Sequence, residues 1–156
     1  MKKLLSILFV SSLFLSCEKE EEPRICCTIV DISMGIKYVD ENGENLLNAE
    51  NGIDVSEIRV YDKIDDEWKI SENPPRLNED GEYLMVNTGY TRNDDDITMS
   101  KIIFADDSED LIIAQLNGES LFNTIIQKVW YNDELVWDNS DKEPRVFEIV
   151  KSTTIQ

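Results

Sequence analysis

Two short stretches of the sequence are rich in carboxylates, which could coordinate a hard cation. "NDDD" covers residues 93–96 and "DDSED" covers residues 106–110. Both stretches lie between predicted strands, and Ca²⁺ draws its oxygen ligands from such loops. The sequence therefore offers a structural calcium site with these candidate ligands: Asp94, Asp95, Asp96, Asp106, Asp107 and Asp110.

The same acids have a simpler interpretation, as solvated loop residues of a very acidic chain. A third acidic stretch, "DENGEN" at residues 40–45, is not an EF-hand loop, because Asn45 stands where that loop requires glycine. Calcium thus remains a candidate structural ion, and no other cofactor is expected.

Catalytic chemistry is restricted by the residues that the chain lacks. The sequence contains no histidine, which excludes His-dependent triads and the usual zinc sites. It also has no glycine-rich phosphate loop or dinucleotide fingerprint. A carboxylate pair could hydrolyse glycosides, but nothing in the sequence selects two of the 33 acidic residues. We therefore expect a protein that is not an enzyme.

Three tryptophans, Trp68, Trp130 and Trp137, are candidates for stacking against a ligand such as a sugar ring. Large aromatic side chains also fill cores and cover sheet faces. Sequence alone leaves both roles open, and the choice depends on the elements that carry the three side chains.

Those elements are predicted to be short strands. Ile32, Met34, Ile36 and Tyr38 alternate with other residues at the two-residue period of a half-buried strand. Asn-Gly at 42–43 and Asp-Gly at 80–81 predict turns. Further strands are expected near 58–61, 82–86, 98–104, 111–116 and 145–150. Seven or eight such segments predict an antiparallel β-sandwich over residues 26–156.

Residues 121–131 have a mixed pattern. Their apolar positions fit a helix that begins after Ser120, yet they are rich in β-branched and aromatic residues. "VWYNDELVW" also fits a hairpin around Asn132-Asp133, with Trp130 opposite Leu135 and Val129 opposite Val136. We favour the strand.

The N-terminus has the layout of a secretory signal. Lys2 and Lys3 precede an apolar stretch at 4–15 that is too short to span a bilayer. "FLSC" at 14–17 resembles the lipobox of bacterial lipoproteins. That resemblance implies that residues 1–16 are removed and that acylated Cys17 anchors the chain in lipid. A conventional cleavage site near Cys17 is the alternative.

An acidic tether, residues 17–25, begins at this cysteine. Lys19, Glu20 and Glu21 resemble the lysine-plus-two-acids export signal of Bacteroidota lipoproteins. The resemblance implies an outer-membrane lipoprotein that faces the extracellular side. A plain solvated spacer would explain the same residues.

The net charge of the chain limits the classes of partner that it can bind. The chain carries −18, and without Lys2 and Lys3 it has 13 basic against 33 acidic residues, a formal charge of −20. Nucleic acid is excluded as a partner, because phosphate binding requires a basic face. Flat docking on an anionic membrane surface is disfavoured for the same reason.

Two stretches at 31–47 and 58–62, "DISMGIKYVDENGENLL" and "IRVYD", resemble the opening of carboxypeptidase-regulatory-like and transthyretin-like modules. This resemblance implies that the antiparallel sandwich is immunoglobulin-like or transthyretin-like. The whole layout resembles small Bacteroidota surface lipoproteins of unknown function, and this resemblance carries no catalytic residues. Two functions follow as expectations. One is a non-catalytic module that binds a protein partner at the cell surface, and the other is a glycan-binding accessory lipoprotein of a nutrient-uptake system.

Overall fold

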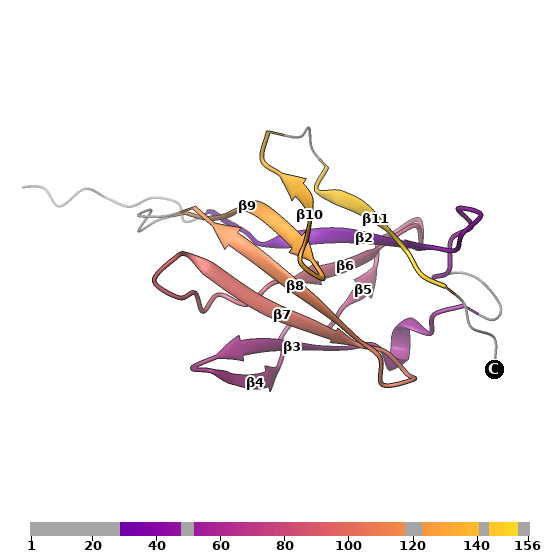
Figure 1. Cartoon of the computed structure of the whole chain (residues 1–156), viewed down its shortest axis with the longest axis horizontal. Helices are drawn as coiled ribbons and strands as arrows, with labels where there is room; N and C mark the ends of the chain where they lie inside the picture. Colours follow the sequence, from indigo (N-terminus) through magenta and orange to yellow (C-terminus); the bar gives the residue numbers. More distant parts are fainter. Residues whose placement is uncertain (1–28, 48–51, 118–122, 141–143, 153–156) are drawn as a thin grey trace, which may run out of the picture.

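The computed structural model describes residues 29–47, 52–117, 123–140 and 144–152. Within these ranges the chain forms strands in two sheets and one short 3₁₀ helix, η1 (Val55–Glu57) (Figure 1). The prediction of an all-β sandwich is confirmed. No helix in the described ranges has the length and apolar character needed to cross a membrane.

The larger sheet follows the order β1-β9-β8-β7-β3-β4, and β10 also pairs with β9. Its strands are β1 (Ile29–Asp31), β3 (Arg59–Ile64), β4 (Glu67–Ile70), β7 (Ile97–Ile103), β8 (Glu109–Leu116), β9 (Asn123–Tyr131) and β10 (Glu134–Asp138). The smaller sheet follows the order β11-β2-β6-β5. Its strands are β2 (Ser33–Val39), β5 (Arg76–Leu77), β6 (Leu84–Asn87) and β11 (Val146–Val150).

Most neighbouring strands are antiparallel, as expected, but two pairs are parallel. β1 runs parallel to β9, and β11 runs parallel to β2. The described strands also outnumber the seven or eight predicted, because β1, β4 and β5 are too short to give a clear alternation. A two-residue period tells which face a side chain occupies but not which strand lies beside it. The sandwich is therefore mixed rather than purely antiparallel.

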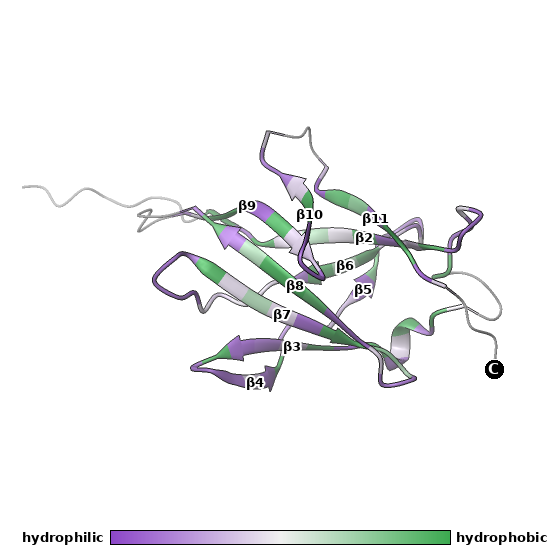
Figure 2. Cartoon of the chain, viewed as in Figure 1, coloured by the Kyte–Doolittle hydropathy of each residue, from purple (hydrophilic) through white to green (hydrophobic). Residues whose placement is uncertain are grey.

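The core lies between the two sheets and contains the side chains that the alternation predicted to point inward. Ile32, Met34, Ile36 and Tyr38 are all buried. Aromatic rings from both sheets meet edge to face here, with Tyr38 at 5.5 Å from Phe104 between ring centroids. Figure 2 shows hydrophobic residues concentrated on the strands, while the turns are mostly hydrophilic.

Residues 123–131 form strand β9, so the preference for a strand over a helix in this segment is confirmed. The hairpin turns at Asn132 and Asp133, which both have positive φ angles, 46° and 69°, as a type I′ turn requires. Trp130 lies opposite Leu135, as predicted. The predicted pairing of Val129 with Val136 is wrong. A bulge after Leu135 brings Trp137 opposite Val129 and turns the indole inward.

Candidate functional site

The acids of residues 93–96 each have their own local environment. Asp96 pairs with Arg92, with 3.1 Å between Oδ1 and Nη1. The side chain of Asn93 accepts hydrogen bonds from the backbone N–H groups of Asp95 and Ile97. Asp94 and Asp95 are exposed. The loop is thus closed by its asparagine side chain.

The acids of residues 106–110 also point in different directions. Asp106 accepts hydrogen bonds from the hydroxyl and the backbone N–H of Ser108, and these bonds lower the pKa of its carboxyl. Asp107 pairs with Arg59 at 3.2 Å on the surface. Asp110 is turned into the protein and is buried. In the described part of the chain, no group of three or more acidic or cysteine residues is placed to hold a metal ion.

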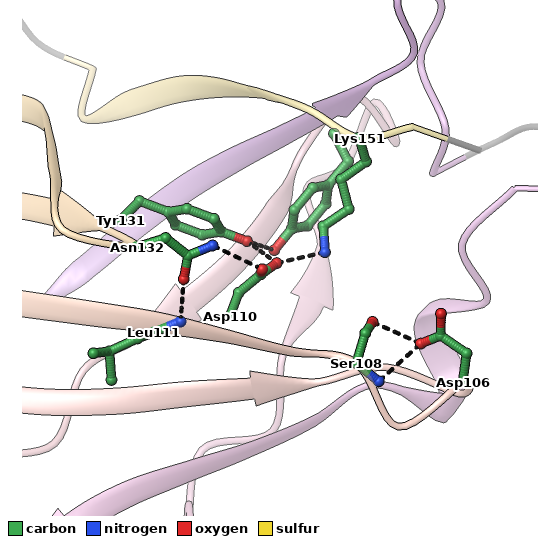
Figure 3. Close-up of polar contacts among 8 residues, drawn as sticks. Asp106, Ser108, Asp110, Leu111, Tyr131, Asn132 and Lys151 are labelled. Atoms are coloured by element: carbon green, nitrogen blue, oxygen red, sulfur yellow. Dashed lines mark hydrogen bonds and ion pairs between the residues drawn. The ribbon is translucent and has the colours of Figure 1, made fainter. Parts of the chain in front are cut away.

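Asp110 is the centre of a buried polar cluster that joins the two sheets (Figure 3). Its carboxylate accepts hydrogen bonds from the Tyr131 hydroxyl and from Nδ2 of Asn132, the latter at 3.0 Å. Nζ of Lys151 lies 2.6 Å from Oδ2 of Asp110. The hydroxyl groups of Tyr131 and Tyr38 are 2.9 Å apart, which links β9 to β2.

The electrostatics of this cluster favour a structural role. Burial raises the pKa of both the Tyr38 and the Tyr131 hydroxyl well above the usual range, so the phenols stay neutral and act as hydrogen-bond donors. The Lys151 ammonium lies 3.8 Å from the centroid of the Phe104 ring, where the ring face attracts a cation. Because Asp110 is fully engaged inside the protein, it is not a calcium ligand in this arrangement.

The pair of Asp110 and Lys151 was not foreseen from the sequence. The sequence pattern predicts a strand that begins at residue 111, which leaves Asp110 among the loop acids. In the structure β8 begins at Glu109, and Asp110 continues the inward set that includes Ile112 and Ala114. Extending the two-residue period by one step would have placed this carboxylate in the core.

The three candidate tryptophans do not form one exposed row. Trp137 is buried beneath Arg145, whose guanidinium carbon lies 4.5 Å from the centroid of the Trp137 ring. Arg145 in turn donates two hydrogen bonds to Asp31, each of 3.1 Å. Trp137 is therefore a core residue and cannot stack on a ligand at the surface. The other two tryptophans point to the opposite face of the same sheet.

Trp68 and Trp130 share the outer face of the larger sheet, which points away from the core. Burial alternates along β7 and β8, so every second residue of these strands points outward. Many outward positions are apolar, and four of them lie side by side across β7, β8, β9 and β10. This set, the outer row, consists of Met99, Ile113, Trp130 and Leu135.

Two further apolar side chains extend this face toward β4. Trp68 is paired in register with Lys63, and Ile70 with Tyr61. Trp68 is 38% exposed and Ile70 is 62% exposed. An antiparallel sheet that faces water normally carries polar side chains on its solvent side. The outer face departs from that pattern.

Charged residues are arranged around the outer row. Lys101 and Lys128 point outward on opposite sides of the row, two residues along from Met99 and Trp130. They pair with Glu109 and Asp138, at 3.0 Å and 3.2 Å. Lys101 also lies 5.1 Å from the centroid of the Trp68 ring. The lysine charges are thus matched by acids nearer the strand ends. The face has an apolar centre, while the chain as a whole remains strongly acidic.

The residues predicted to determine the location of the protein lie outside the described ranges. These are the lipid-attachment residue Cys17 and the export signal at 19–21. Their roles stay predictions.

No family model, no curated protein and no solved structure matches this chain at the significance required. The resemblance to carboxypeptidase-regulatory-like and transthyretin-like modules, and to surface lipoproteins, therefore also stays a prediction.

Proposed function

We propose that this protein is an outer-membrane lipoprotein that acts as a non-catalytic binding module at the cell surface. Acylated Cys17 holds it in the membrane, and the acidic tether of residues 17–25 separates the sandwich from the lipid headgroups. Lys19, Glu20 and Glu21 direct it to the extracellular side. The support for this address is the sequence pattern of the first 25 residues.

The observation that carries the binding role is the outer row on the larger sheet. Met99, Ile113 and Trp130 lie in register on three adjacent strands, with Leu135 beyond them and 49% exposed. A contiguous apolar surface on a soluble domain marks an interaction site, because leaving it in water costs free energy that a partner recovers. The residues around it supply the polar rim that is typical of protein interfaces.

The partner that this surface fits is another outer-membrane protein. Its contact surface would be apolar at the centre, to cover the outer row, and basic at the rim. A basic rim follows from the formal charge of −20 on the mature chain, since complementary charge steers association and like charge opposes it. The module would then be an accessory subunit of a surface complex.

Glycan binding is the second candidate, and one observation favours it. Trp68 and Trp130 both lie on the outer face, where flat rings and nearby lysine ammonium groups could contact a sugar chain. Trp137 is buried and takes no part. The two roles can be separated at Trp68, which lies on the outer face but outside the outer row. Trp68→Ala would weaken glycan stacking, whereas a protein interface centred on the outer row would be retained.

The proposal is tested by capturing the native protein from solubilised outer membranes and identifying what accompanies it by quantitative mass spectrometry. A membrane protein recovered in a fixed ratio to the lipoprotein supports an accessory subunit. Recovery of the lipoprotein alone, together with binding to purified surface glycans, would replace the first role with the second.

A further inference from the structure

Strand β4 forms one edge of the larger sheet, and its outer side is unpaired among the described residues. All four residues of β4 are exposed. At the opposite edge of this sheet, β10 carries a bulge after Leu135, and bulges twist an edge away from further pairing. The other strand at that edge, β1, is only 3 residues long. Within the larger sheet, β4 is therefore the edge most open to another strand.

The backbone of β4 determines which residues could pair. Ser71 N–H donates to the carbonyl of Val60 at 2.8 Å, and hydrogen-bonded pairs alternate along an antiparallel ladder. Lys69 and Glu67 therefore direct their backbone groups toward β3. Trp68 and Ile70 direct theirs to the open edge. A partner strand must bind through these two residues.

The side chains of β4 favour a second copy of the same chain. Glu67 and Lys69 flank Trp68 and point to the other face of the strand. In an antiparallel pair with a two-fold axis at Trp68, each Glu67 lies opposite the Lys69 of the other copy. The two Trp68 residues then exchange backbone hydrogen bonds, as their free N–H and C=O groups allow.

We propose that two copies of this protein pair edge to edge through β4, with the two-fold axis at Trp68. Within one chain, Lys69 Nζ and Glu67 Oε2 are 3.9 Å apart and both side chains are exposed, so exchanging this contact for a cross-strand one costs little. A register shifted by two residues, with its axis at Lys69, would instead place two lysines opposite each other. Opposite charges across an antiparallel pair are favoured and like charges are disfavoured.

The net charge of each copy does not prevent this pairing. At physiological salt, charges more than about 8 Å apart are largely screened, so the groups that face each other across β4 dominate. Pairing would also join the outer faces of the two copies into one continuous sheet with both Trp68 residues at the junction. The inference is independent of whether the outer face binds a protein or a glycan.

Charge reversal at β4 tests the proposed register. The full chain, purified in mild detergent, is followed by native mass spectrometry over a concentration series as wild type, Glu67→Lys, Lys69→Glu and the double variant. Each single variant should weaken the dimer on the order of tenfold, because it places like charges opposite each other twice. The double variant should restore the wild-type affinity. Melting temperatures check that all four proteins are folded.

The two single variants change the net charge in opposite directions, so they control for overall repulsion. If net charge governed association, Glu67→Lys would strengthen the dimer and Lys69→Glu would weaken it, and the register would be wrong. A wild-type chain that stays monomeric throughout the series would overturn the proposal, as would a double variant that fails to recover.

Discussion

Lys151 is the cation of the buried cluster, and replacing it with methionine isolates the contribution of its charge. The side chain keeps its length and its contact with the Phe104 ring, while Asp110 loses the ammonium that lies 2.6 Å from its carboxylate. The carboxylate keeps its hydrogen bonds from Tyr131 and Asn132. The substitution therefore leaves a buried anion with two donors and no counter-charge.

The expected loss in the free energy of unfolding follows from the burial of Asp110 and Lys151. Removing one member of a fully buried ion pair costs about 3–5 kcal/mol. Here the Asp110 side chain is 8% exposed and the Lys151 side chain 23% exposed, and the remaining donors stabilise the carboxylate. We expect Lys151→Met to lower the free energy of unfolding by about 2 kcal/mol. For a domain of this size that corresponds to a fall of roughly 8 °C in melting temperature.

Urea unfolding of the wild type, Lys151→Met, Asp110→Asn and the double variant gives the coupling between the two residues. Lys128→Met is the matched control, since its pair with Asp138 is more exposed, at 42% and 31%, and should contribute less than about 1 kcal/mol. A loss for Lys151→Met no larger than that of the control, with no coupling to Asp110, would refute the structural role of this cluster.

Three further predictions use other parts of the chain. Cys17→Ala should abolish incorporation of a fatty-acid label, and label retained in that variant would show that another residue is acylated. Alanine substitution of residues 19–21 should leave the protein membrane-bound but protected from protease added to intact cells, whereas equal cleavage in both strains would reduce this segment to a spacer. The raised pKa values of Tyr38 and Tyr131 mean that both phenols stay protonated in the folded state above about pH 10, where unfolded tyrosine ionises. The contribution of these two phenols to the free energy of unfolding should therefore be fully present below pH ~10 and be lost as the pH rises above it. Tyr38→Phe should reduce that slope by about 1.4 kcal/mol per pH unit, and an unchanged slope in urea unfolding would contradict the burial of its hydroxyl.

Much of the fold could be predicted because the alternation of apolar residues is strong on the central strands. The pattern from Ile32 to Tyr38 predicted the correct inward face of that strand, and Asn132-Asp133 predicted the correct position of the hairpin turn. The β3–β4 hairpin was not predicted. Its turn uses Asp65 and Asp66, both at positive φ, and aspartate is a weaker signal for that conformation than Asn-Gly or Asp-Gly.

The candidate site was harder to predict because it depends on which strands are neighbours. Met99, Ile113, Trp130 and Leu135 come from four strands, and the sequence does not reveal that they share one row. A single bulge decided that Trp137 is buried while Trp130 stays on the outer face. The local pattern cannot supply that information, because the bulge depends on how β10 packs over the core.

Substitutions on the outer face test the proposed binding surface most directly. Ile113→Glu places a charge in the middle of the outer row, and Gln115→Glu places the same charge on the same face of the same strand, beside the row. Both variants, shown to be folded by their melting temperatures, are compared with the wild type in capture from solubilised outer membranes. We predict that Ile113→Glu loses the accompanying membrane protein and that Gln115→Glu retains it. Equal recovery of that protein with both variants would show that the outer row is not the binding surface.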